Sequence, residues 1–164
     1  MVDKIACNIW IKWYFKRTLN PSEEEGMKRV LLAIALACWF SAPVSAEIRI
    51  LRDPGGQIGP YLEKLASWHA SGESIIVDGP CLSACTLVLG VIPHERVCAT
   101  RRARFGFHAA WRPMGIYRVR SNNGTALLMK IYPPRVKAWI KKRGGLNGKM
   151  IFARGSEIGV RPCR

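Results

Sequence analysis

Residues 78–110 have the sequence DGPCLSACTLVLGVIPHERVCATRRARFGFHAA, and this segment holds the main functional signals of the chain. The apolar run before it ends at Gly79-Pro80, a strand-ending turn signal. The small and apolar residues 83–89 are typical of the first turns of a buried helix. Ser83 is therefore expected where a loop enters a helix, beside backbone N–H groups that have no intrahelical acceptor. Such N–H groups are suited to hold a developing oxyanion.

Two further motifs accompany this serine. The segment Phe105-Gly106-Phe107-His108 alternates like a strand, which puts Gly106 and His108 on one face. Upstream, Pro54-Gly55-Gly56 directly follows the strand-like residues 48–51. Paired glycines after a strand let the backbone turn tightly and present its N–H groups at close range. The three motifs together suggest one site.

Their order resembles the proteolytic subunit of Clp protease, in the wider Clp/crotonase superfamily. The shared features are PGG after a strand, a G-x-x-x-S turn into a helix, and a strand ending in histidine. The CxSAC and GFHAA segments resemble exported bacterial proteins of this fold, mostly described as predicted periplasmic proteins. The resemblance covers roughly residues 47–110. It implies an α/β fold with a Clp/crotonase-like ββα spiral core over residues 47–164, truncated because the family's first strand–helix unit is missing.

The resemblance also implies roles for individual residues. Ser83 is the expected nucleophile and His108 the expected base, with the backbone N–H groups of Gly56 and Ala84 as the oxyanion hole. The substrate would be a peptide or an ester, and no organic cofactor or metal is expected. The family places a catalytic aspartate after the histidine, but this chain has no Asp beyond Asp78. The orienting candidates that remain are Glu157 and Asn147.

The rest of the chain predicts alternating strands and helices. Apolar residues at helical spacing from Ile58 to His69 predict a helix that ends at Gly72, before a buried strand at 75–77. Further helices are expected at 125–132 and from Pro134, with a basic loop in between His108 and Ser121. His69 and His94 are expected to be packing or surface residues. No metal site is predicted from their spacing.

Four cysteines follow residue 46, and in an exported domain they favour disulfides with three connectivities open. We expect Cys85 to meet Cys98 beneath the nucleophile helix and Cys81 to pair with Cys163. A zinc site at the CxxxC segment is the alternative.

The N-terminal part predicts export. Residues 27–46 have the charged start, apolar run and small-residue cleavage site of a signal peptide, and an uncleaved anchor is the alternative. The protein is therefore expected in the periplasm. Residues 1–26 form a doubtful extension, since signal peptides begin at the initiator methionine; Met27 is the expected true start. A genuine extension at the membrane interface is the other interpretation.

The chain is strongly basic, with 26 Lys and Arg against 11 Asp and Glu among 164 residues. This charge favours anionic partners such as a cell-envelope polymer or lipid; nucleic acid is less favoured. Three classes of function remain. They are a serine hydrolase of Clp type, a catalytically inactive relative that binds a peptide or envelope partner, and a polyanion binder that uses Arg101, Arg102, Arg104 and Lys141–Arg143. A homo-oligomer follows from the resemblance and from the sheet edge that the missing unit leaves open.

Overall fold

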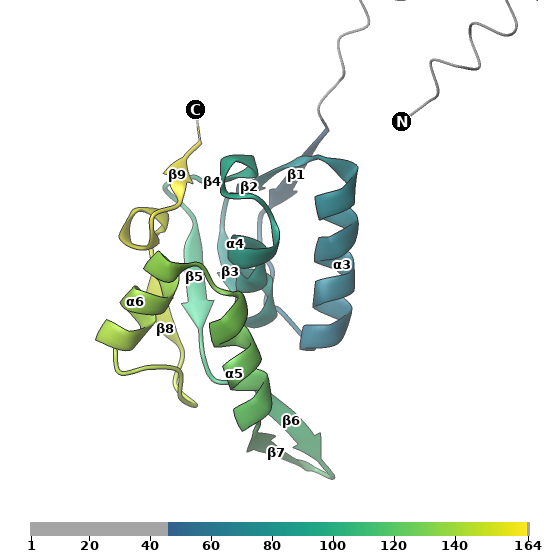
Figure 1. Cartoon of the computed structure of the whole chain (residues 1–164), viewed down its shortest axis with the longest axis vertical. Coiled ribbons are helices and arrows are strands. Elements are labelled where there is room, and N and C mark those ends of the chain that lie inside the picture. The colour runs from purple at the N-terminus through teal and green to yellow at the C-terminus, as the bar shows by residue number, and fades with distance from the viewer. Residues whose placement is uncertain (1–45, 164) are drawn as a thin grey trace, which may run out of the picture. The chain divides into compact units, whose positions relative to one another are not determined.

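The computed structural model describes residues 46–163 (Figure 1). The expected extension (1–26) and the expected signal peptide (27–46), apart from its last residue, lie outside the described residues. Residues 45–164 form a compact unit by themselves. This unit is α/β, as the sequence predicts, with helices and strands that alternate through much of its length.

Two small sheets form the centre of the described unit. The first has four parallel strands in the order β1-β2-β4-β9. The second has three strands in the order β3-β5-β8, with β3 and β5 parallel and β8 antiparallel to β5. The strands are β1 (Glu47–Ile50), β2 (Ser74–Val77), β3 (Pro80–Leu82), β4 (Val97–Ala99), β5 (Arg104–Phe107), β8 (Ile151–Ala153) and β9 (Arg161–Pro162).

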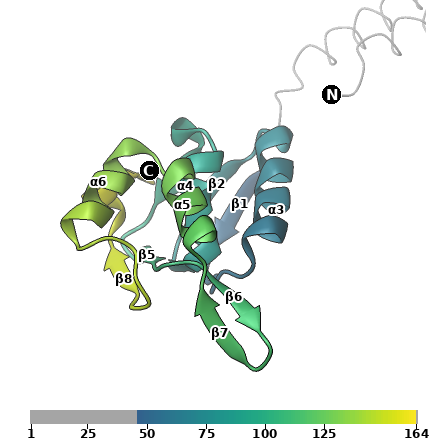
Figure 2. The same cartoon turned by 60° about the horizontal axis from the view of Figure 1, so that its bottom comes forward.

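The helices connect these strands and cover the core, as Figures 1 and 2 show. They are α3 (Ile58–Ser71), α4 (Val88–Val91), α5 (Asn122–Ile131), α6 (Pro134–Lys142) and the 3-10 turns η1 (Ser83–Leu87), η2 (His94–Arg96) and η3 (Gly155–Ile158). Helix α3 ends at Gly72, whose φ of 79° is the left-handed conformation of a glycine C-cap. The Arg96 side chain donates to the carbonyls of Trp68, His69 and Glu73 at this helix end.

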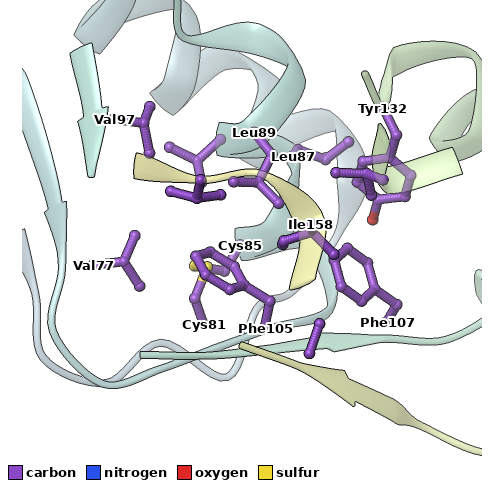
Figure 3. Close-up of a cluster of buried hydrophobic side chains, with 14 of the residues drawn as sticks. Val77, Cys81, Cys85, Leu87, Leu89, Val97, Phe105, Phe107, Tyr132 and Ile158 are labelled. Atoms are coloured by element: carbon purple, nitrogen blue, oxygen red, sulfur yellow. A yellow bond between two sulfur atoms is a disulfide. The ribbon is translucent and has the colours of Figure 1, made fainter. Parts of the chain in front are cut away.

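The hydrophobic core includes Cys81 and Cys85, which flank the serine turn in the sequence (Figure 3). Phe105 and Phe107 of β5 are fully buried, and the Phe107 ring packs edge-on against Tyr132 at 5.4 Å between centroids. The buried core residues span Ile50 to Val160. Because this unit carries its own core and both of the disulfides described below, we expect it to fold without residues 1–44.

The segment after His108 differs from the expected loop. It forms the antiparallel hairpin β6 (Trp111–Met114) and β7 (Tyr117–Arg120), which projects from the body (Figure 2). Gly115 has a φ of 59°, as the first central residue of a two-residue type II′ turn requires. Pro113 argues against a strand, but a hairpin edge tolerates proline.

Candidate functional site

Ser83 lies where the chain turns from β3 into η1, as the sequence predicts. Its φ of 55° is in the left-handed region, and it is the one non-glycine residue with a positive φ among those described. This conformation is costly for a residue with a Cβ and is found where surrounding structure enforces it. A strained serine at the tip of a strand-to-helix turn presents its hydroxyl outward, as nucleophilic serines do on other folds.

The PGG turn packs directly against the serine turn. A Cβ on Gly55 would clash with the carbonyl oxygen of Leu82 and lie 2.7 Å from Ser83 Cβ and 2.8 Å from Ala84 N. The residue also has a φ of 81°. Only glycine permits this close approach, so the first glycine of the PGG motif is explained by its contact with the serine turn.

His108 follows β5 directly and reaches the serine. Its Nε2 lies 2.9 Å from Ser83 Oγ. Its Nδ1 lies 2.7 Å from the carbonyl oxygen of Ala109. Since a carbonyl only accepts, Nδ1 carries the proton and donates to it. Nε2 is then left as an acceptor for the serine hydroxyl, which is the tautomer that a general base needs.

The two side chains expected to orient His108 lie elsewhere, and that prediction is wrong. The Glu157 carboxylate accepts from Arg154 N at 2.7 Å and lies 3.3 Å from Arg143 Nη2, where it caps η3. The Asn147 side chain accepts from Lys149 N at 2.8 Å. Asn147 still contributes through its backbone, because its carbonyl accepts the Ala109 N–H at 2.7 Å. This bond fixes the N-terminal side of Ala109, the residue whose carbonyl oxygen accepts from the imidazole.

A pocket of about 300 Å³ opens at this pair. Its lining includes Ser83, His108 and both residues expected to form the oxyanion hole, Gly56 and Ala84. The hairpin supplies much of the opposite wall through Trp111, Pro113, Gly115, Ile116, Tyr117 and Arg118. The structure thus brings the hydroxyl, the imidazole and the two backbone segments to one cavity.

Buried hydrogen bonds hold the serine turn from below. Thr86 Oγ1 donates to the Ser83 carbonyl at 2.6 Å and lies 2.6 Å from the Tyr132 hydroxyl. Burial raises the pKa of Tyr132 to about 12. The phenol therefore stays protonated and donates to Thr86, and the chain of hydrogen bonds fixes the carbonyl next to the strained serine.

The PGG turn is fixed from the other side by Asp53. Its carboxylate accepts from Gly55 N at 2.9 Å and from the hydroxyl of Tyr61, and Lys64 Nζ lies 3.3 Å away. Burial alone would raise the pKa of the Asp53 carboxyl, but these donors outweigh it and the pKa is lowered. An ionised Asp53 ties the turn to helix α3.

The four cysteines form two disulfides, but not the expected pairs. Cys81 joins Cys85, with 5.3 Å between the Cα atoms, and Cys98 joins Cys163. The sharp turn at Ser83 brings Cys81 and Cys85 together. Strand β9 pairs beside β4, with Cys163 N donating to the Ala99 carbonyl at 3.2 Å, and this places Cys163 over Cys98. The expected Cys85–Cys98 and Cys81–Cys163 pairs are therefore wrong.

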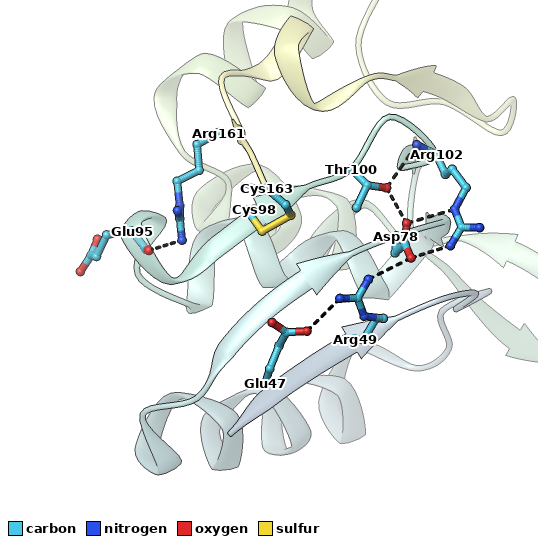
Figure 4. Close-up of a disulfide and its surroundings, with 9 residues drawn as sticks. All are labelled: Glu47, Arg49, Asp78, Glu95, Cys98, Thr100, Arg102, Arg161 and Cys163. Carbon is cyan, nitrogen blue, oxygen red and sulfur yellow. Dashed lines mark hydrogen bonds and ion pairs between the residues drawn. A yellow bond between two sulfur atoms is a disulfide. The ribbon is translucent and has the colours of Figure 1, made fainter. Parts of the chain in front are cut away.

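Asp78 lies at the end of β2 in a cluster of cations (Figure 4). Its carboxylate accepts from Arg102 at 2.5 Å and 3.0 Å, from Thr100 at 2.6 Å and from Arg49 at 3.1 Å. Hydrogen bonds from Arg102, then Thr100 and Arg49, hold the pKa of the Asp78 carboxyl well below its usual range. Arg102, one of the expected polyanion contacts, is thus paired with Asp78, although its side chain is 70% exposed.

The other expected polyanion contacts are scattered. Arg101 lines a second cavity, of about 780 Å³, with Arg49 and Arg154. Arg143 stacks over the Trp139 ring, 4.8 Å from its centroid. Within residues 46–163, no helix is both long and apolar enough to span a membrane, and no three His, Cys, Asp or Glu side chains are grouped as metal ligands.

Comparison with protein-family models gives no match for this chain. Comparison with curated proteins gives no match either.

Proposed function

We propose that this protein is an exported serine hydrolase of peptidase type that acts through Ser83 and His108. The observation that carries the proposal is the 2.9 Å contact between Ser83 Oγ and His108 Nε2, made by a serine in the left-handed conformation at the edge of a pocket. Nucleophile and base within hydrogen-bond reach, with the base oriented by a third group, is the arrangement that acyl transfer requires.

The reaction follows the steps of serine acyl transfer. Ser83 Oγ attacks the carbonyl carbon of a peptide or ester while His108 Nε2 takes the hydroxyl proton. The oxyanion that forms is placed at the N–H groups of Gly56 and Ala84. The imidazolium returns its proton to the leaving amine or alcohol, which leaves an acyl group on Ser83. Water then attacks the acyl carbon with His108 as base and releases the acid.

The acceptor behind the imidazole sets the expected rate. In a triad, a carboxylate fixes the tautomer and also stabilises the imidazolium; an amide substitute that gives the wrong tautomer lowers turnover about 10⁴-fold. The Ala109 carbonyl supplies the correct tautomer but carries no negative charge. We therefore expect Ser83 to acylate and to turn over slowly, with a loss smaller than about 10⁴-fold relative to a full triad.

We also propose that the domain is a shortened Clp/crotonase-like protein. The parallel pairing of β3 with β5 and of β1 with β2, and the order of the PGG, serine and histidine motifs, support this assignment. Export is supported by the two disulfides, which form in oxidising compartments.

A fluorophosphonate probe tests the proposal, because it phosphonylates only an activated serine. We expect wild type to be labelled and both Ser83→Ala and His108→Ala to lose labelling while remaining folded. Ser67→Ala is the matched control, since Ser67 is an exposed serine on α3 whose hydroxyl bonds only the Lys64 carbonyl. Labelling that survives Ser83→Ala refutes the proposed nucleophile.

A second candidate is a Clp-like protein that binds a peptide without cleaving it. The neutral Ala109 carbonyl behind His108 favours it, since a weakly oriented base activates serine poorly. Folded wild type that takes up no probe, yet binds peptide in the pocket, supports this candidate over the hydrolase.

A further inference from the structure

The β6–β7 hairpin is the most exposed apolar feature of the described residues. Ile116 at its turn is 90% exposed, and beside it Tyr117 is 69% and Met114 54% exposed; Trp111, at the base, is 45% exposed. The hairpin extends away from the body in both views (Figures 1 and 2). Exposed apolar side chains gathered at one projecting tip indicate a surface that meets an apolar partner.

Arginines flank this apolar tip. Arg112, Arg118 and Arg120 lie on the two strands, with Arg112 opposite Val119 and Arg118 opposite Pro113. Arg118 stacks over the Trp111 ring, 4.0 Å from its centroid, and Arg120 donates to the Leu146 carbonyl at 3.1 Å. No Asp or Glu occurs between Glu95 and Glu157 in the sequence. The hairpin and the elements that follow it thus carry cationic side chains without acidic ones.

An apolar tip flanked by arginines favours one kind of partner. A second copy of the chain would bring two arginine-bearing hairpins together, and like charges facing each other across strands are unfavourable. A bilayer with anionic headgroups instead offers an apolar interior for the tip and negative charge for the arginines. Aromatic side chains favour the boundary between the two. Peripheral binding of this kind needs both signals, and the hairpin supplies both.

We propose that the β6–β7 hairpin docks on an anionic lipid surface, with Met114, Ile116 and Tyr117 entering the acyl boundary and Arg112 and Arg118 contacting lipid phosphates. The proposal does not depend on hydrolysis. The same hairpin lines the Ser83 pocket, so docking holds the mouth of that pocket close to the bilayer.

Co-sedimentation with vesicles tests the proposal on the unit that begins at Ser45, which omits the apolar segment 27–44. Vesicles of phosphatidylcholine with phosphatidylglycerol should bind this unit, and vesicles of phosphatidylcholine alone should bind it far more weakly. One arginine near an anionic surface contributes about a fivefold change in binding, so Arg112→Gln with Arg118→Gln should weaken it about 25-fold. Raising the salt concentration should weaken wild-type binding as well.

Matched variants distinguish the contribution of the hairpin to vesicle binding from that of the net charge. Lys141→Gln with Lys142→Gln removes the same charge from α6 and should change binding no more than about threefold. Replacing Met114, Ile116 and Tyr117 with serine should abolish quenching of Trp111 by brominated lipid, measured against a Trp111→Phe control. Ser83→Ala should bind vesicles as strongly as wild type does. Lipid docking can therefore be tested whether or not the protein is a hydrolase.

Three results would overturn the proposal. The first is equal binding to neutral and anionic vesicles. The second is an equal loss in the α6 and hairpin charge variants, which would show a response to net charge alone. The third is self-association that depends on the hairpin without vesicle binding, which would identify a second copy as the partner.

Discussion

Both disulfides should stabilise the protein, but the one that contributes less to stability should contribute more to the reactivity of Ser83. One pair, Cys81–Cys85, is separated by 4 residues and encloses Ser83 at its centre; the other, Cys98–Cys163, is separated by 65. Loop-closure entropy assigns about 2 kcal/mol to a ring as short as the first and about 4 kcal/mol to one as long as the second. Removing the long-range bridge should therefore cost about twice as much unfolding free energy.

Reactivity should follow the reverse order. The left-handed conformation at Ser83 costs roughly 1–2 kcal/mol, and the small ring helps to enforce it. If the turn relaxes when the ring opens, the reactive conformation becomes about 5- to 30-fold less populated. The rate of fluorophosphonate labelling should fall by that factor in Cys81→Ala with Cys85→Ala. It should stay near the wild-type rate in Cys98→Ala with Cys163→Ala.

Urea unfolding gives the stability of each double variant, and the labelling rate is measured well below the unfolding transition. The reasoning is refuted if the Cys81/Cys85 variant is folded and labels as fast as wild type. It is equally refuted if the Cys98/Cys163 variant, while folded, shows the larger loss of labelling, since Ser83 lies outside the loop that this disulfide closes.

Further substitutions test the surroundings of the site. Gly55→Ala should slow labelling, because its Cβ would displace the serine turn, whereas Gly59→Ala, where a Cβ meets nothing within 4 Å, should not; equal rates contradict the close-packing argument. The free energy of unfolding of Ser83→Gly should be about 1 kcal/mol higher than that of Ser83→Ala, since glycine tolerates the left-handed conformation. Equal free energies of unfolding would show that the backbone at residue 83 is unstrained. Wild type should lose stability as the pH rises from about 10 towards 12, because the unfolded chain releases the Tyr132 proton at a lower pH than the folded protein does. Tyr132→Phe should remove this loss. The same pH dependence of stability in both proteins would contradict the raised pKa of Tyr132. Wild type should lose stability as the pH falls below about 4, because the pKa of the Asp78 carboxyl is lower in the folded protein than in the unfolded chain. Asp78→Asn should remove this loss. An unchanged loss of stability at acid pH in the variant would contradict the role of the arginine partners.

Local signals in the sequence were enough to locate the main elements. Gly72 marked the end of α3, Pro134 marked the start of α6, and the apolar runs marked β1 and β2. The proximity of Ser83 and His108 was expected from the order of motifs, which itself came from a family resemblance. The parallel pairing of β3 with β5 accounts for it physically, because it aligns Leu82 with Gly106, one residue before Ser83 and two before His108.

The errors arose where long-range pairing or backbone atoms decided the outcome. Strand β9 has only two residues, so no pattern could indicate that it lies beside β4 and brings Cys163 to Cys98. The partner of His108 Nδ1 is a backbone carbonyl, which every residue carries, so a search among acidic and amide side chains could not find it. The hairpin was missed because Pro113 interrupts its first strand, although Gly115 followed by one residue is a type II′ turn signal.

Pre-steady-state hydrolysis of an activated ester is the most direct test of the central claim that Ser83 is an activated nucleophile with a weakly supported base. We predict a burst of alcohol close to one equivalent per chain, followed by slow turnover, with the acyl group found on the peptide that contains Ser83. Folded protein that gives no burst and carries no acyl group on Ser83 would contradict the claim.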